Sequence, residues 1–326
     1  MVQQCQYATP DGAQCLEDAQ DGHTLCVWHD AAIDKSGPDW AARLEAVGRD
    51  GLSMAGFELA RAHLDGVNLT FPEQDSGVDL RFANLQRASL KGARLYRADF
   101  SGANLLKANL SDGNLNAAKF ENADLLGTVF GGAHMDGIDW GASVRQENEA
   151  RDADKAGQLA RAVEKFREAE EIYRDLRMTS ELHGHRRMAG EFFFREMLMR
   201  HYRLPRFSAV RWVSRFAHII YGYGERPAHI ISCALAYLFF FAFLYFWLGV
   251  SDHGVYEAFD PTKGVFFNLS VFGHCLYFSV VTFTTVGYGD VLAHDGWTRA
   301  IAAFEALSGN FIMALFVVVF VRKLAR

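Results

Sequence analysis

The most constraining feature of this chain is a five-residue period that runs, with one interruption, through residues 54–140. A large apolar residue occupies every fifth position, and a small residue usually stands two places before it, as Ala83 does before Leu85. A period of five fits neither the 3.6-residue turn of an α-helix nor the two-residue alternation of a β-strand. It fits a four-sided coil in which each side is one repeat. The large residue then fills the interior, and the small residue lets the neighbouring corner close over it.

This pattern resembles the right-handed quadrilateral β-helix of pentapeptide-repeat proteins, which we expect over residues 50–143. The resemblance implies four repeats per coil and about four coils, stacked so that neighbours stabilise one another and both ends need a cap. Because eleven residues separate Leu69 from Leu80, we expect residues 71–77 to bulge from one edge.

The charge of the coil argues against one function of such proteins. Some pentapeptide-repeat proteins imitate DNA with an acidic surface and occupy topoisomerases, whereas the outward positions here carry both signs, as at Arg87 and Asp99. The formal net charge of the whole chain is a modest −6. We therefore expect no nucleic-acid partner, and interpret the coil as a rigid spacer, a docking platform or a surface for contacts between subunits.

Residues 1–40 contain a set of metal ligands with the spacing C-x9-C-x10-C-x2-H: Cys5, Cys15, Cys26 and His29. These soft ligands suit tetrahedral Zn²⁺. In a reducing compartment, three cysteines ending in Cys-x-x-His favour a metal over disulfides. The spacing is similar to the zinc motif of plant WRC domains, although the Arg-rich surroundings that suit DNA binding are missing. We predict a structural zinc, because four protein ligands leave no open position, with His23 as a substitute ligand; the alternative is unconnected cysteines.

Residues 144–204 change to a helical period. A break at Gly184 separates two apolar stretches. The stretch before the break is a helical stripe that consists of Leu159, Val163, Phe166, Tyr173 and Leu176. We predict a helical hairpin, similar to a single tetratricopeptide unit, that packs against the coil or a neighbouring subunit and serves structural linkage rather than ligand sensing. His183 and His185 are a further metal candidate, but a solvated turn is the better interpretation.

Residues 205–227 mix apolar side chains, including Trp212, with Arg206, Arg211 and Arg215. A basic amphipathic helix that bears a tryptophan lies naturally at the level of the lipid headgroups. We therefore predict an interfacial helix that couples the N-terminal part of the chain to its apolar C-terminal part.

Two apolar runs of bilayer-crossing length, residues 228–250 and 297–321, bracket a shorter apolar stretch at residues 271–284. Directly after the short stretch come Thr285, Val286, Gly287, Tyr288, Gly289 and Asp290. Consecutive carbonyl groups point to one side only where some φ angles are positive, which glycine adopts without a steric penalty. Rings of such carbonyls replace the water around a dehydrated K⁺ ion. The segment therefore predicts a potassium selectivity filter.

The run FSVVTFTTVGYGD at residues 278–290, with its flanking helices, resembles bacterial two-transmembrane potassium channels over residues 228–326. The resemblance implies a first membrane helix at 228–250, a pore helix at 271–284, a filter at 285–290 and a second membrane helix at 297–321. It also implies a homotetramer, because one filter strand cannot enclose an ion. Some such channels pair the aspartate after the filter with a carboxylate in the pore helix. This chain has Val281 at that position, so Asp290 needs another partner or has none.

The second membrane run holds the candidate pore and gate residues: Glu305, Gly309, Asn310, Met313, Val317 and Val321. Glu305 lies within apolar sequence, so we expect a network role near the back of the filter. The resemblance places Gly309 at the hinge of the pore-lining helix. Asn310 either faces the central cavity or forms an interhelical hydrogen bond. Met313, Val317 and Val321 would line a cytoplasmic constriction that closes by dewetting.

Charge sets the predicted orientation. Basic residues precede the first membrane run and follow the second, whereas the connection between them is acidic. Because positive residues remain on the cytoplasmic side, we expect both termini in the cytoplasm of a bacterium, with the chain in its inner membrane. Residues 1–30 have no apolar core of a signal peptide. Regulation would then enter through the N-terminal part, and a cytosolic regulator is an expected partner.

We therefore predict a multidomain chain with a zinc motif, a pentapeptide-repeat β-helix, a helical hairpin linker and an all-α, two-transmembrane, tetrameric pore domain. It would conduct K⁺ passively and is not expected to be an enzyme. The alternatives are a weakly selective cation channel, which Tyr288 disfavours, and a membrane-anchored pentapeptide-repeat scaffold, which the intact filter disfavours.

Overall fold

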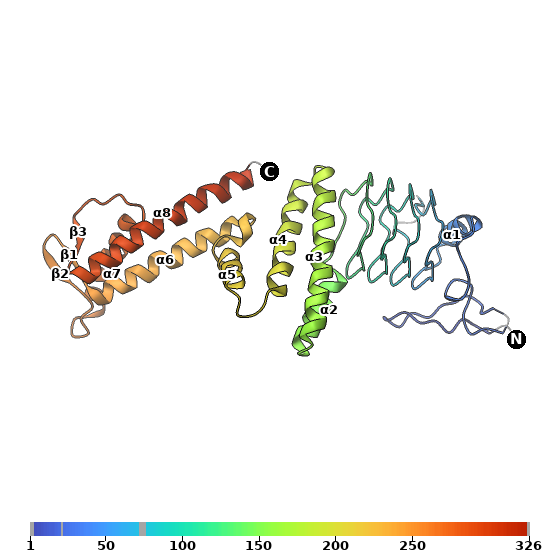
Figure 1. Cartoon of the computed structure of the whole chain (residues 1–326), viewed down its shortest axis with the longest axis horizontal. Coiled ribbons are helices and arrows are strands. Elements are labelled where there is room, and N and C mark those ends of the chain that lie inside the picture. Colours follow the sequence, from blue (N-terminus) through green and yellow to red (C-terminus); the bar gives the residue numbers. More distant parts are fainter. Residues whose placement is uncertain (1–2, 21, 72–75, 325–326) are drawn as a thin grey trace. The chain divides into compact units, whose positions relative to one another are not determined.

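The computed structural model describes residues 3–20, 22–71 and 76–324 of the chain. The chain divides into two compact units, Met1–Leu204 and Pro205–Arg326, and each has its own apolar core. Figure 1 shows a repeat coil with helices in the first unit, and long helices with a small sheet in the second.

Successive turns of the coil are 20 residues apart. A parallel bridge joins Asp79 to Asp99, and the same spacing continues as far as Asp139. Since 20 residues are four repeats, each of these turns has four sides, as the five-residue period predicts. The large apolar residues and the alanines before them lie inside; Leu85 and Ala83, for example, are fully buried.

The interruption of the period lies in an earlier turn. There the bridge between Glu58 and Asn84 joins residues 26 apart in place of 20, so the turn accommodates the extra residues. Of the expected bulge at residues 71–77, residues 72–75 lie outside the described residues.

Sides of the coil end in turns whose third residue has a positive φ angle. In one of them the Ala88 N–H donates to the Leu85 carbonyl oxygen at 3.0 Å, and Arg87 has φ 57°. This is the geometry of a type II turn, which favours glycine at the third position. Several of these positions carry other residues, including Ala117 with φ 59°. An L-residue adopts this conformation only at a cost in free energy.

The N-terminal segment covers the first end of the coil. The Trp28 ring stacks on Phe57 with centroids 5.0 Å apart, and the Glu58 N–H donates to the Trp28 carbonyl oxygen at 2.8 Å. Helix α1 (Asp39–Arg49) adds Leu44, which is fully buried, to the same core. This segment provides the cap that the end of a stacked coil needs.

Three helices cover the other end: α2 (Arg145–Lys155), α3 (Leu159–Leu182) and α4 (Arg186–Arg203). The Trp140 ring stacks on Phe120 inside the coil, with centroids 5.2 Å apart, and meets Phe192 of α4 edge-on at 5.6 Å. The Tyr173 hydroxyl of α3 accepts a hydrogen bond from the Val144 N–H at 3.2 Å. Both ends of the coil are therefore closed by segments outside the repeats.

These helices differ from the predicted hairpin in two respects. Helix α2 precedes the α3–α4 pair, and its sequence, RQENEARDADK, is too polar to show an apolar stripe. At the start of α3, Leu159 and Val163 are 52% and 42% exposed, whereas Phe166, Tyr173 and Leu176 are buried. The predicted stripe therefore packs into the core only from Phe166 onward.

The second unit begins with the short amphipathic helix α5 (Ala209–Tyr221). Ser208 caps its start by accepting a hydrogen bond from the Arg211 N–H at 3.2 Å, and Gly222 closes its end with φ 53°. Within the second unit, no residue of α5 is buried. Its exposed apolar side chains are Val210, Trp212, Val213, Phe216 and Ile219.

A short 3₁₀ helix, η1 (Gly222–Gly224), leads to the remaining elements: α6 (Pro227–Leu248), β1 (Val250–Asp252), β2 (Val255–Glu257), α7 (Val265–Phe283), β3 (Val291–Ala293) and α8 (Gly296–Leu324). Strand β1 pairs antiparallel with both β2 and β3. Figure 1 shows this sheet at one end of the α6–α8 pair and the C-terminal end of α8 at the other. The sheet therefore joins the hairpin before α7 to the segment that comes after residues 285–290.

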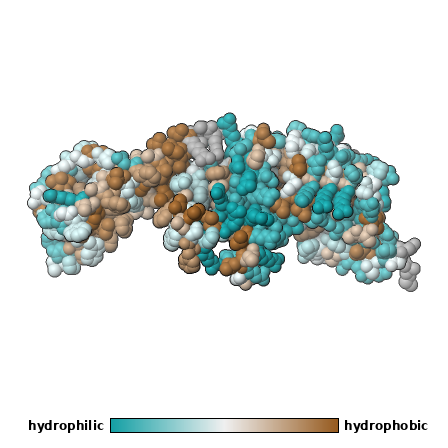
Figure 2. Space-filling model, in the orientation of Figure 1, coloured by the Kyte–Doolittle hydropathy of each residue, from teal (hydrophilic) through white to brown (hydrophobic). Residues whose placement is uncertain are grey.

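Helices α6, α7 and α8 are each long and apolar enough to cross a membrane, by length and composition. In Figure 2 apolar side chains gather over α6 and α8, whereas the end that carries the sheet is more hydrophilic. Helix α7 begins at Val265, earlier than the predicted pore helix at 271–284. The earlier start is compatible with the polar residue Asn268, because its side-chain amide donates to the carbonyl oxygens of Asp260 at 2.9 Å and Lys263 at 3.1 Å.

The turn geometry predicts opposite effects for two neighbouring alanines of the coil. Replacing Ala117 with glycine relieves a positive φ angle, and should stabilise residues 1–204 by roughly 0.5–1 kcal/mol. Ala118 is fully buried and has no positive φ, so replacing it with glycine should destabilise residues 1–204 by about 1 kcal/mol or more. Urea unfolding of residues 1–204 checks both values. A destabilising Ala117→Gly change would contradict the assigned turn.

Candidate ion pathway and metal cluster

The predicted filter segment leaves α7 in an alternating backbone conformation. Thr285, Gly287 and Gly289 have φ angles of 56°, 57° and 82°, whereas the residues between them have no positive φ. When left-handed residues alternate with ordinary ones, successive peptide groups face the same side of the strand. Sequence reasoning anticipated the two glycines. It missed Thr285, because a β-branched residue is an outlier at positive φ.

The carbonyl groups of residues 285–288 accept no hydrogen bond from the described part of the chain. The segment is also exposed, with Val286 at 53% and Tyr288 at 73%. Backbone carbonyls in folded proteins are almost always paired with protein or with water. The single chain therefore presents a row of oxygen atoms whose partners must come from outside it.

Asp290, two residues after this row, is held by two donors. The Tyr277 hydroxyl of α7 donates to its Oδ2 at 2.8 Å, and the Val291 N–H donates to its Oδ1 at 3.0 Å. The hydrogen bond from Tyr277 holds the pKa of the Asp290 carboxyl below its usual range. In some of the resembled channels, the partner of this aspartate is a carboxylate at the position that Val281 occupies here. The partner found here lies one helical turn earlier.

Glu305 joins the three long helices. Its side chain is fully buried, and its Oε2 accepts a hydrogen bond from the Tyr245 hydroxyl of α6 at 2.6 Å. Its Oε1 accepts from the Ser279 hydroxyl of α7 at 2.5 Å. A buried carboxylate needs such donors. Because Ser279 stands four residues before Phe283, the last residue of α7, this network holds the part of α7 that leads into the filter segment.

Gly309 lets α8 approach the end of α7. A Cβ atom at Gly309 would lie 2.8 Å from the carbonyl oxygen of Phe283 and 3.2 Å from its Cα atom. Phe283 is the last residue of α7. The missing side chain therefore allows α8 to pack closely against α7 where the filter segment begins. This packing role is additional to the hinge role that the resemblance implies.

The remaining gate candidates share one face of α8. Asn310, Met313, Val317 and Val321 are exposed, and spacings of three and four residues put them on one side of a helix. The Asn310 side chain forms no hydrogen bond within the described part of the chain. A hydrogen bond between helices of one chain, one of its two expected roles, is therefore not observed.

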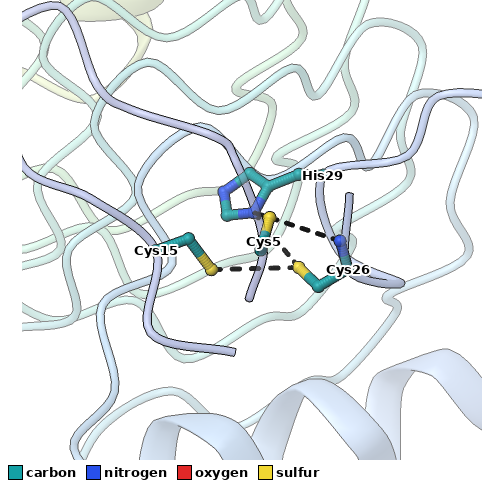
Figure 3. A group of neighbouring side chains, drawn as sticks. All are labelled: Cys5, Cys15, Cys26 and His29. Carbon is teal, nitrogen blue, oxygen red and sulfur yellow. Dashed lines mark hydrogen bonds between the residues drawn. The ribbon is translucent and has the colours of Figure 1, made fainter. Parts of the chain in front are cut away.

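The four predicted metal ligands converge on one point, as Figure 3 shows for Cys5, Cys15, Cys26 and His29. One ligand atom from each lies within 4.8 Å of all the others. The Sγ atoms of Cys15 and Cys26 are 3.9 Å apart, so no disulfide joins them. Metal–sulfur bonds of about 2.3 Å would place two tetrahedral sulfur ligands about 3.8 Å apart. The arrangement therefore fits a tetrahedral metal ion.

The coil orients His29 as a ligand. Its Nε2 donates to the Ala55 carbonyl oxygen at 3.0 Å, which leaves Nδ1 facing the Cys26 Sγ at 3.2 Å. A partner on the second ring nitrogen is usual for a metal-bound histidine. Burial lowers the pKa of His29, which favours the neutral ring that a metal ligand needs. Burial raises the pKa of the Cys15 thiol to about 12, and metal binding would displace that proton.

The other histidines considered as ligands lie elsewhere. His23 is outside the cluster, and its Nδ1 lies 3.2 Å from the Asp30 carboxylate. His183 and His185 flank Gly184 in the turn between α3 and α4, with ring centroids 6.5 Å apart. Among the described residues, neither belongs to a group of converging metal ligands.

Two family models match parts of the chain. Residues 232–326 match a family described as ion channels, and residues 76–112 match eight copies of pentapeptide repeats. No curated protein matches the chain. The chain therefore carries an ion-channel domain and pentapeptide repeats. With three helices that are able to cross a membrane, the channel domain indicates a membrane protein.

Solved pentapeptide-repeat proteins are similar to a limited part of the chain. Rfr23 from the cyanobacterium Cyanothece 51142 is 31% identical, with a TM-score of 0.19; the match covers 28% of this chain and 54% of that one. A protein of the Arabidopsis thaliana thylakoid lumen is 27% identical, with a TM-score of 0.16; the match covers 29% of this chain and 64% of that one.

The contact at Gly309 predicts that a single methyl group disturbs the channel domain. The Gly309→Ala change forces α8 away from Phe283, and should destabilise this packing by about 1–3 kcal/mol. Gly273→Ala on α7 is the matched control, because its Cβ would meet no atom within 4 Å. Thermal unfolding of the full-length protein in detergent compares the two variants. Equal melting temperatures for Gly309→Ala and the wild type would contradict the close contact.

Proposed function

We propose that this protein is a homotetrameric, potassium-selective ion channel. The observation that carries the proposal is the exposed row of carbonyl groups at residues 285–288, without donors in the described chain and with positive φ at Thr285, Gly287 and Gly289. Irregular backbone at membrane depth is tolerated only where it is enclosed by protein or lines a water-filled cavity. Four copies around one axis meet both conditions, because the four rows face one another across a narrow path.

The carbonyl oxygens of residues 285–288 would replace the hydration shell of K⁺, with the Thr285 hydroxyl as an inner layer. The C-terminal end of α7 directs its negative dipole end toward the ion path, which favours a cation. Asp290 and Tyr277 hold the outer end of the filter, while Glu305 and Gly309 fix its inner end. Transport would be passive, so no residue needs to act as a catalyst.

In this proposal α6 and α8 cross the membrane, and α7 enters and returns through the filter segment. The exposed apolar side chains of α5, together with its exposed Arg215, suit the headgroup level of the bilayer. Both termini then lie in the cytoplasm, and the membrane is the inner membrane of a bacterium. Asn310, Met313, Val317 and Val321 would line the cytoplasmic half of the pore, where apolar side chains close it by dewetting.

Residues 1–204 would form a cytosolic regulatory or assembly domain. Zn²⁺ is the ion that the three thiolates and one imidazole suit best, and four protein ligands make its role structural. The metal would hold the N-terminal segment onto the coil, because His29 contacts both the cluster and Ala55. A cytosolic regulator would bind to this domain.

Liposome flux of the purified full-length protein tests the central proposal. We expect flux under a K⁺ gradient and none under a Na⁺ gradient, and a changed rate when residues 1–204 are removed. Gly287→Ala should abolish flux, since a side chain strains its φ of +57°, whereas Gly264→Ala, without a positive φ and with open space around it, should retain flux. Equal K⁺ and Na⁺ flux would indicate a weakly selective channel. If neither the full-length protein nor the protein without residues 1–204 gives any flux, the membrane-anchored scaffold would be favoured.

A second experiment tests the metal. In residues 1–204 produced alone, Cys26→Ser should abolish bound zinc and lower the melting temperature, because metal-binding energy contributes to folding. His23→Ala is the matched control and should retain the metal, since His23 lies outside the cluster. Elemental analysis with thermal unfolding gives both values. Full zinc content in Cys26→Ser would overturn the assigned ligand set.

A further inference from the structure

A second group of metal ligands converges in the channel unit, where the sequence shows only scattered acidic residues. Asp252 at the end of β1, Glu257 at the end of β2 and His274 on α7 each offer one ligand atom, all within 4.8 Å of one another. The His274 Nδ1 lies 2.7 Å from the Glu257 Oε2 and 3.8 Å from the Asp252 Oδ2. The group thus combines three side chains from three different elements.

Burial and ligand type point to a particular class of ion. The three side chains are partly exposed, at 24% for Asp252, 20% for Glu257 and 40% for His274, so an ion can enter from solvent. One imidazole with two carboxylates suits first-row transition metals such as Zn²⁺ or Ni²⁺ better than Mg²⁺ or Ca²⁺, which prefer all-oxygen sites. Three protein ligands also leave a coordination position for water.

The group is connected by two routes to Asp290, which follows the filter segment. On one side, Asp252 pairs with Val291 in the β1–β3 ladder, and the neighbouring His253 N–H donates to the Asp290 carbonyl oxygen at 3.2 Å. On the other side, His274 stands three residues before Tyr277, on the same face of α7, and Tyr277 donates to Asp290. An ion held by Asp252, Glu257 and His274 would fasten the hairpin to α7, and so restrain the chain around Asp290.

We propose that Asp252, Glu257 and His274 form an outer binding site for a divalent transition-metal ion, and that occupancy changes conduction through the filter. The location on the outer side and the effect on conduction rest on the proposed channel function. The binding site itself does not, because it depends only on three ligands that the fold of this unit brings together.

Calorimetric titration of the full-length protein in detergent tests the site, with Zn²⁺ alone as the probe. The protein is first loaded with Zn²⁺ and desalted, so that the Cys26 cluster is filled and the titration reports the weaker site. We expect one further ion per chain, with affinity at least about tenfold lower in both His274→Ala and Glu257→Gln. His294→Ala is the matched control: His294 contacts Tyr256 of the same sheet, with ring centroids 4.5 Å apart, but lies outside the group. The Cys26→Ser variant should still bind Zn²⁺ at Asp252, Glu257 and His274, because Cys26 belongs to the other group of ligands.

Two results would overturn the site: no binding to the wild type, or undiminished binding to His274→Ala and Glu257→Gln when both variants elute and melt like the wild type. Conduction is then tested in liposomes, with Zn²⁺ added outside. We expect K⁺ flux to change by twofold or more in the wild type and in His294→Ala, but not in His274→Ala. Normal binding with unchanged flux would overturn the coupling alone. If no form of the protein conducts K⁺, the proposed function fails, while calorimetry still decides the site.

Discussion

The backbone carbonyls of residues 285–288 impose the main physical requirement on this protein. They project from an exposed, irregular segment with alternating left-handed residues, and the described chain provides no donor for them. In an apolar environment an unpaired carbonyl is costly, so the segment requires either water or a cation. The surrounding contacts serve this requirement. Tyr277 holds Asp290 at one end, while Glu305 and the close approach at Gly309 fix the helices at the other.

In the first unit, the main physical requirement is that both open ends of the coil are covered. A stacked coil leaves an apolar interior and unpaired backbone groups at each end. Here Trp28 and α1 cover one end, while Trp140 and the helices α2 to α4 cover the other. The metal cluster belongs to the first cap, since His29 contacts the Ala55 carbonyl oxygen. A metal bound by these four side chains would therefore belong to the same structural arrangement that caps the coil.

Strong local patterns made much of this predictable from sequence. The five-residue period predicted a turn of 20 residues and the buried positions, because each repeat obeys the same steric rule. The Cys and His spacing predicted ligands that do converge. The features that were missed depend on tertiary contacts or lack a periodic signal. Helix α2 is polar, the Tyr277–Asp290 pair forms only when the segment after α7 folds back on it, and the candidate ligands around His274 come from three elements.

A structure of the protein determined by electron cryomicroscopy in lipid nanodiscs with K⁺ tests the central claim most directly. We expect four chains around one axis, with ion density between the facing carbonyl groups of residues 285–288. We also expect Asn310 and the exposed face of α8 below it to line the same axis. Filter segments that face lipid, or an assembly in which they lie apart without ion density, would contradict the account.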